Sequence, residues 1–294
     1  MQYTLVLETK ESPASIVSYA SQIGNDFDIV DLDGGSKQVK CPNGTINAYN
    51  SGKVVIQSSN QEWANSIYSS LGGQFGVGSN TKSFVPHIGV DESGKGDYFG
   101  PMVIAAVFVD KDQADELVKI GVRDSKKLAD SSAKRLHIKI LKLCKYSSEV
   151  VISPGKYNDL YKKIGNVNKL LAWGHSRSIE NILEDIPPGV CGRVVIDQFS
   201  MRKSRVLDAL MKNGRKLEIV QKHKGESDIA VAAASVVARG RFLLEIEKMS
   251  RTHRVEFPKG ASNVVEFARS FVHKFGKSEL YNVAKISFKT TSKI

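Results

Sequence analysis

The sequence of 294 residues is poor in cysteine and contains no long apolar run. Its three cysteines, Cys41, Cys144 and Cys191, are odd in number, far apart and never in a Cys-x-x-Cys spacing. A disulfide framework or a zinc site is therefore not expected, and a reducing cytoplasm is favoured. The longest apolar stretches, such as residues 102–109, have the length of a strand, whereas a membrane helix needs about 20 apolar residues. The N-terminus also lacks the basic start and apolar stretch of a secretory signal. We therefore expect a cytoplasmic protein that does not associate with membranes.

Arginine is missing from residues 1–80, which carry four lysines and seven acidic residues, a net charge of −3. Because the whole chain has a formal charge of +11, the remainder carries +14. A basic excess of this size indicates a polyanionic partner such as a nucleic acid, since neutralising phosphates is the main sequence-independent source of nucleic-acid affinity. Many basic proteins bind no nucleic acid, so charge alone leaves the question open.

The pattern of turns and periodicity predicts two domains. Residues 1–72 alternate short β-prone runs with two helices and form a small α+β unit. Residues 73–84 are rich in glycine, serine and polar side chains, which is typical of a linker. Residues 85–294 then alternate strands and helices, which predicts an α/β domain with a mixed sheet flanked by helices. The expected strands of this domain lie within 87–110, at 149–154, at 193–197 and at 217–223, and the expected helices at 128–143, 157–183, 202–213, 229–249 and 264–275.

Two neighbouring acids, Asp91 and Glu92, follow an apolar strand and precede the glycine-rich segment that includes Gly94, Lys95 and Gly96. Adjacent carboxylates do not suit a hydrophobic core, because buried unpaired charges cost several kcal/mol. Their oxygens suit Mg²⁺ or Mn²⁺, and the glycines allow a ligand to approach the backbone closely. A solvated acid pair at a strand end is the alternative interpretation.

The segment beginning at Gly89 also matches most of a phosphate-binding P-loop, with Gly94 and Lys95 at the expected spacing. However, Gly96 stands where serine or threonine would bind the metal. Asp91 and Glu92 would moreover repel the phosphates, so this alternative is disfavoured.

Two further acids lie near other strand ends. Asp197 ends the strand at 193–197, and Glu226 lies in a polar turn before an alanine-rich helix. Each has a structural alternative, because strand ends are often acidic and a carboxylate favours the start of a helix. Acids at the ends of strands in one sheet can converge, and four carboxylates would then need cations. Two divalent ions about 4 Å apart would neutralise them and support phosphodiester cleavage.

These motifs together resemble those of the type 2 ribonucleases H, and those of bacterial ribonuclease HIII more than those of ribonuclease HII. Lys95 stands where ribonuclease HII has arginine, and Glu226 stands where it has aspartate. The N-terminal unit is similar to the TATA-binding-protein-like domain of ribonuclease HIII. The segments that carry the resemblance are 91–101, 124–128, 166–175, 224–226, 232–238 and 257–261, together with Asp197.

The resemblance implies a ribonuclease H fold and an endonuclease that cleaves the RNA strand of RNA/DNA hybrids, leaving 5′-phosphate and 3′-hydroxyl ends. It implies that Asp91, Glu92, Asp197 and Glu226 are the catalytic residues and hold two Mg²⁺ or Mn²⁺ ions. Asp91 would bridge both ions, and Glu226 would complete the site of the attacking water. Glu92 and Asp197 would hold the ion that stabilises the leaving 3′-oxygen. No obligate protein partner is implied, and a monomer is expected.

Substrate contacts are implied for Gly94, Lys95 and Gly96, whose backbone would approach the 2′-hydroxyls that distinguish RNA from DNA. Ser125 and Lys126 would contact phosphate, although capping of the following helix is an equal alternative.

Three further polar residues carry alternatives of their own. Asp97 is expected to be a turn residue outside the acid cluster. His175 is expected to be packed or on the surface rather than catalytic. The same holds for His223, although its place near Glu226 leaves a proton-shuttling role open.

The N-terminal unit is expected to grip the hybrid, as in the family it resembles, despite its negative charge. One sheet face with Lys37, Lys40 and Lys53, together with Asn47, Tyr49 and Asn50, is the expected backbone-binding surface. Two other functions remain to be compared with cleavage of continuous hybrids. One is a ribonuclease HII-like activity on single ribonucleotides embedded in DNA. The other is nucleic-acid binding without catalysis, which applies only if the four acids do not converge.

Overall fold

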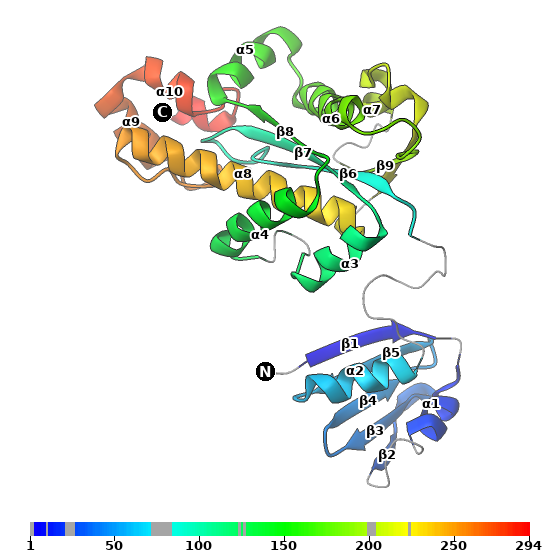
Figure 1. Cartoon of the computed structure of the whole chain (residues 1–294). Helices are drawn as coiled ribbons and strands as arrows, with labels where there is room; N and C mark the ends of the chain where they lie inside the picture. The colour runs from blue at the N-terminus through cyan, green and yellow to red at the C-terminus, as the bar shows by residue number, and fades with distance from the viewer. Residues whose placement is uncertain are drawn as a thin grey trace. The chain divides into compact units, whose positions relative to one another are not determined.

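The computed structural model describes residues 3–9, 11–20, 27–71, 84–122, 125, 128–198, 204–222 and 225–294. The chain divides into two compact units, Met1–Lys82 and Ser83–Ile294 (Figure 1). This division falls within the expected linker 73–84, of which only residue 84 is described.

The first unit is an antiparallel sheet with helices α1 (Pro13–Ala20) and α2 (Gln61–Ser70) packed on one face. Ile16 of α1 and Ile67 of α2 meet the inward-facing side chains of alternate sheet positions, among them Val39, Ile46 and Ile56. This alternation is the period of two that a half-buried sheet requires. The sheet order is β1-β5-β4-β3-β2, with β1 Tyr3–Glu8, β2 Asp28–Asp31, β3 Lys37–Cys41, β4 Gly44–Ala48 and β5 Lys53–Ser58.

The same alternation corrects the expected lysine face. Lys40 and Lys53 lie on the sheet face that the helices leave open, together with Asn47. Lys37 is three residues before Lys40 and therefore lies on the opposite face, where it pairs with Asp31. The expectation that all three lysines share a face was wrong, because odd spacing along a strand reverses the side chain.

The second unit is built on a mixed five-stranded sheet, which confirms the expected fold class. The pairs β10–β9 and β9–β6 are parallel, whereas β6–β7 and β7–β8 are antiparallel. Helices cover both faces of this sheet (Figure 1). The sheet order is β10-β9-β6-β7-β8, with β6 His87–Ser93, β7 Met102–Val109, β8 Ser147–Ile152, β9 Arg193–Asp197 and β10 Glu218–Lys222.

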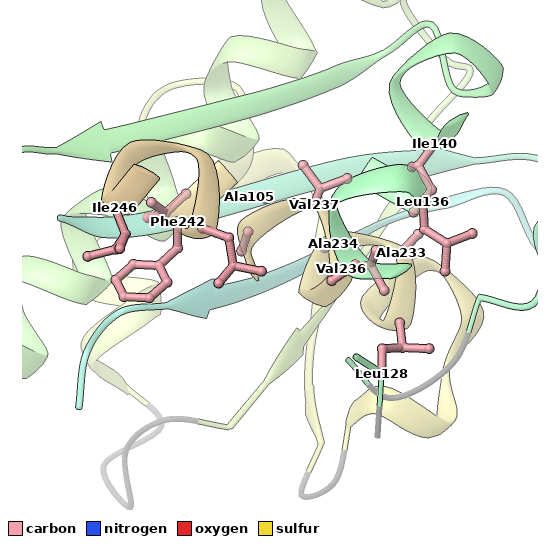
Figure 2. Packing of buried hydrophobic residues seen from close by; sticks show 14 of the residues in the cluster. Ala105, Leu128, Leu136, Ile140, Ala233, Ala234, Val236, Val237, Phe242 and Ile246 are labelled. Carbon is pink, nitrogen blue, oxygen red and sulfur yellow. The ribbon is translucent and has the colours of Figure 1, made fainter. Parts of the chain in front are cut away.

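Strand β7 is buried along its whole length and separates two apolar cores. Alternate residues such as Ala105 face the long helix α8 and belong to a core that also contains Val237 and Phe242 of α8 and Leu136 of α4 (Figure 2). The intervening residues, such as Ile104, face α6. The helices of this unit are α3 Lys111–Lys119, α4 Asp130–Leu143, α5 Pro154–Ile164, α6 Val167–Asp185, α7 Ser204–Ala209, α8 Ile229–His253, α9 Val265–Phe275 and α10 Lys277–Val283.

The stretch 157–183, which was expected to be mostly helical, is divided into α5 and α6. Gly165 adopts a left-handed conformation (φ 65°) at the end of α5, and the Asn166 side chain accepts hydrogen bonds from the backbone amides of Asn168 and Lys169 to start α6. A left-handed glycine followed by an N-capping asparagine is a strong local signal for a break between helices. None of the helices in the described ranges is long and apolar enough to cross a membrane.

Candidate active site

An open cavity of about 470 Å³ lies at the end of β6, where the strand leads into the glycine-rich turn. Strands β6 and β9 are parallel neighbours, and Val90 pairs with Ile196. The next residues along the two strands, Asp91 and Asp197, therefore reach the same edge of the sheet. The cavity is lined by Asp91, Glu92, Ser93, Gly94, Lys95, Gly96, Ser125, Asp197, Ser235 and Arg239.

The surroundings of Asp91 raise the pKa of its carboxyl group. Burial, with the negative charges of Glu92 and Asp197, raises the pKa of its carboxyl to about 7. A hydrogen bond with Ser235 and one from the backbone amide of Glu92 (2.8 Å to Oδ1) act in the opposite direction. The site therefore brings together carboxylates whose mutual repulsion a cation would relieve.

Glu92 is held ionised by its neighbours. Burial disfavours its charge, but the hydrogen bond and charge of His175 and the charge of Lys95 together lower the pKa of Glu92. Its Oε2 lies 3.0 Å from Nε2 of His175, and its Oε1 lies 3.6 Å from Nζ of Lys95. The two acids of the adjacent pair thus have opposite pKa shifts.

Asp197 is connected to the segment of Glu226 by a hydrogen bond from the residue before Glu226. The amide of Gly225 donates a hydrogen bond of 2.8 Å to Oδ1 of Asp197. Glu226 is the next residue, so its backbone lies close to the site, although its side chain is not among those that line the cavity. The structure thus brings three of the four expected acids to one cavity and leaves Glu226 beside it.

The residues present suit a divalent cation in chemistry. Carboxylate oxygens are the ligands that Mg²⁺ and Mn²⁺ prefer, and burial together with the negative charges of Glu92 and Asp197 raises the pKa of Asp91. Within the described part of the chain, however, no three acidic, histidine or cysteine side chains already form a metal-binding group. Asp91, Glu92 and Asp197 each accept a hydrogen bond from a protein donor through one carboxylate oxygen.

The two glycines of the turn differ in what requires them. Gly94 has a φ of 81°, and a Cβ there would lie 2.2 Å from the carbonyl oxygen of Pro101. Gly96 has no positive φ, and a Cβ there would have no neighbour within 4 Å. Gly94 is therefore needed by the fold, whereas Gly96 leaves free space beside the cavity.

Ser125 is buried, and its Oγ is 2.8 Å from Oγ of Ser235 on α8. Its carbonyl accepts a hydrogen bond from Arg239, which also donates to Asp130 (2.8 Å). The capping alternative for Ser125 is wrong, because α4 begins at Asp130 and its N-cap is Ala129. Lys126 and His223 lie outside the described residues.

Two residues that line the cavity, Ser235 and Arg239, were not predicted from the sequence. They are one helical turn apart on α8, a spacing that places side chains on the same face.

Asp97 is a turn residue, as expected, and accepts a hydrogen bond of 2.6 Å from the amide of Gly260. His175 is fully buried, which confirms the packed interpretation, but its contact with Glu92 was not foreseen.

Comparison with known proteins agrees with this geometry. A family profile described as ribonuclease HII matches residues 88–291. The chain is 39% identical to the ribonuclease HIII of Protochlamydia amoebophila, over 85% of this chain and 83% of that protein. It is 38% identical to the ribonuclease HIII of Chlamydia abortus, over 86% of this chain and 85% of that protein.

Two solved structures have the same fold over nearly the whole chain. The crystal structure of Bst-RNase HIII in complex with Mn²⁺ superimposes with a TM-score of 0.69 at 28% identity, covering 99% of this chain and 97% of that one. The RNase H3 of Aquifex aeolicus gives a TM-score of 0.57 at 25% identity, covering 97% and 100%. The chain therefore belongs to the ribonuclease HIII family of type 2 ribonucleases H and is an endoribonuclease.

Proposed function

We propose that this endoribonuclease hydrolyses the RNA strand of RNA/DNA hybrids with the help of two divalent cations, leaving 5′-phosphate and 3′-hydroxyl ends. One observation carries the proposal: Asp91, Glu92 and Asp197 line the same cavity as the turn from Gly94 to Gly96. A cluster of acids beside exposed backbone can hold cations and approach a nucleic acid in one place.

The proposed ligands of the two Mg²⁺ or Mn²⁺ ions are Asp91, Glu92, Asp197 and Glu226. When bound, such ions lower the pKa of an attacking water and neutralise charge on the leaving oxygen. The protein's part is to bring the carboxylates of Asp91, Glu92 and Asp197 to the same cavity. The hydrogen bond from Gly225 to Asp197 supports the inclusion of Glu226, because it keeps the following residue close.

Recognition of RNA is proposed to rest on the backbone of Gly94, Lys95 and Gly96. Hydrogen bonding to a 2′-hydroxyl is how a protein distinguishes RNA from DNA at a given site, and the open space at Gly96 gives a ribose room to approach. Ser125 and Lys126 are proposed to contact phosphate, and Ser125 lines the cavity as this role requires.

The first unit is proposed to add affinity for the hybrid. Lys40 and Lys53 share the open sheet face with Asn47, and Asp28 is the cross-strand partner of Lys40 there. The added affinity is proposed to come from these two lysines, even though the unit is net negative. Phosphate contacts of this kind position a protein on a duplex without reading its sequence.

The proposed function is tested by replacing Asp91 with Asn in the full chain. We expect Asp91→Asn to abolish cleavage of a labelled RNA/DNA hybrid in Mg²⁺ and in Mn²⁺, because a neutral amide cannot replace the carboxylate between two cations. Binding of the hybrid, measured by fluorescence anisotropy, should remain.

Asp115→Asn is the matched control, because Asp115 is an exposed acid of α3 whose carboxylate forms an ion pair with Lys111. This variant should cleave like the wild type. Cleavage by Asp91→Asn at the wild-type rate would refute the proposed chemistry.

Activity on single ribonucleotides embedded in DNA is the second candidate, because the family profile that matches the chain is that of ribonuclease HII. A duplex with one ribonucleotide and a continuous hybrid of the same sequence should be compared in one assay. We expect cleavage of the continuous hybrid to dominate. Efficient cutting on the 5′ side of the lone ribonucleotide would favour the second candidate instead.

A further inference from the structure

His175 contacts Glu92 of the acid pair and does not line the cavity. Its side chain is fully buried and its Nε2 lies 3.0 Å from Oε2 of Glu92, 83 residues away in the sequence. Glu92 lines the cavity, whereas His175 does not. The imidazole therefore contacts the carboxylate without being accessible to a substrate, which excludes a direct role for it in proton transfer to the RNA.

The residue before His175 explains how α6 comes so close to Glu92. A Cβ on Gly174 would lie 2.7 Å from Cδ1 of Ile104. Ile104 of β7 is the residue that pairs with Glu92 across the β6–β7 ladder. The missing side chain at Gly174 thus lets the helix approach the sheet at the level of Glu92, and the next residue supplies the imidazole.

The two partners of the Glu92 carboxylate differ in how firmly they are held. Lys95, near Oε1, has a flexible side chain that is about one-third exposed, so it can move away when a cation enters. His175, near Oε2, is enclosed by the packed interior and cannot move away from the carboxylate. One oxygen is therefore fixed by the protein and the other can be released to the cavity.

We infer that His175 is a positioning residue that orients Glu92, so that Oε1 of this carboxylate is presented to a divalent cation. This inference rests on the proposed function, since it assumes that Glu92 is a ligand. Groups that hydrogen-bond to metal ligands fix their orientation, and their loss typically costs about 10–100-fold in metal affinity or activity. His175 would act in this way through geometry alone.

The test measures Mn²⁺ binding to the full chain without substrate, by the EPR signal of free Mn²⁺. His175→Gln and His175→Asn both replace the imidazole with an amide. The glutamine amide nitrogen reaches the position of Nε2 and can donate to Glu92, whereas the asparagine amide falls short. We expect His175→Asn to weaken Mn²⁺ binding about 10-fold or more and His175→Gln to stay closer to the wild type.

His137→Asn is the control for loss of a buried histidine. His137 is also buried, and its Nε2 lies 2.7 Å from Oε1 of a glutamate, Glu149, but neither residue lines the cavity. This variant should lose thermal stability and bind Mn²⁺ like the wild type. Raising the Mn²⁺ concentration should restore hybrid cleavage by His175→Asn, because its defect lies in cation binding.

The outcomes separate this inference from the proposed function. Equal Mn²⁺ affinity of His175→Asn and His175→Gln would overturn the positioning role. If Asp91→Asn weakens Mn²⁺ binding in the same experiment, the proposed cation site still stands. If Asp91→Asn also binds Mn²⁺ like the wild type, the cation site itself is wrong and the inference fails with it.

Discussion

The two glycines of the active-site turn allow the contributions of fold and function to be separated. Gly94→Ala forces a left-handed conformation on a residue with a side chain, which costs about 1–2 kcal/mol. Its Cβ would also overlap the Pro101 carbonyl oxygen, 2.2 Å away, and relieving such overpacking costs typically 1–3 kcal/mol. The combined loss is about 2–5 kcal/mol.

Gly96→Ala has no such cost. Its φ is not positive and its Cβ would meet nothing within 4 Å. Replacing glycine at a compatible position stabilises a protein by about 0.4–1 kcal/mol through the unfolded state. The new methyl group would nevertheless occupy the space where a ribose must approach, and a displacement of about 1 Å can cost roughly 100-fold in rate.

Both variants should be measured by thermal unfolding and by kcat/KM on a labelled RNA/DNA hybrid. A change of 1 kcal/mol shifts Tm by about 2–4 °C for a unit of this size, so Gly94→Ala should unfold at least several degrees earlier. Gly96→Ala should keep or slightly raise its Tm and lose most of its activity. Wild-type activity of Gly96→Ala would refute substrate approach at the turn, and an unchanged Tm of Gly94→Ala would refute the packing argument.

Three further perturbations test other parts of the structure. Burial lowers the pKa of Lys285 to about 7, below the usual value of lysine near 10.4. Between these two values the unfolded state binds more protons at this residue than the folded state does. The free energy of unfolding should therefore rise with pH from about pH 7 to about pH 10. Lys285→Met should flatten the rise in urea midpoint between pH 7 and pH 9, and an unchanged slope would contradict this assignment. Gly89→Ala would place a Cβ 2.1 Å from the backbone of Ala230 and should lower the free energy of unfolding by about 1–3 kcal/mol in urea titrations. An unchanged free energy of unfolding would contradict the close packing of β6 on α8. Deleting residues 1–80 should weaken hybrid binding in anisotropy titrations and leave the effect of Asp91→Asn on cleavage intact, whereas equal affinity of the truncated and full chains would exclude a binding role for the first unit.

The strands of the second unit were predictable because their apolar runs are distinct. The strand at 193–197 was predicted with its observed bounds, and the acid at its end reaches the cavity. The P-loop alternative is also decided by the structure, because Gly89 lies inside β6 and its missing side chain accommodates the backbone of α8. A glycine in a strand gives the same sequence signal whether a phosphate or a helix approaches it.

Contacts between distant segments were not predictable from one sequence. Spacing along the chain carries no information about the contact of His175 with Glu92, which depends on how closely α6 packs on the sheet. The placement of Glu226 beside the cavity rather than in it likewise depends on the turn at Gly225, not on residue type. Whether Glu226 binds a cation remains a prediction.

The turn of the active site is completed by the far end of the chain. The amide of Lys285 donates to the carbonyl of Tyr98, the amide of Gly100 donates to the carbonyl of Val283, and Nζ of Lys285 donates to the carbonyl of Gly100. During synthesis, all four proposed catalytic acids have therefore emerged before the segment that braces the turn has been made. A nascent chain halted before Val283 would carry all four acids beside a turn that lacks these contacts, so nuclease activity should begin only after Val283 and Lys285 have joined the fold.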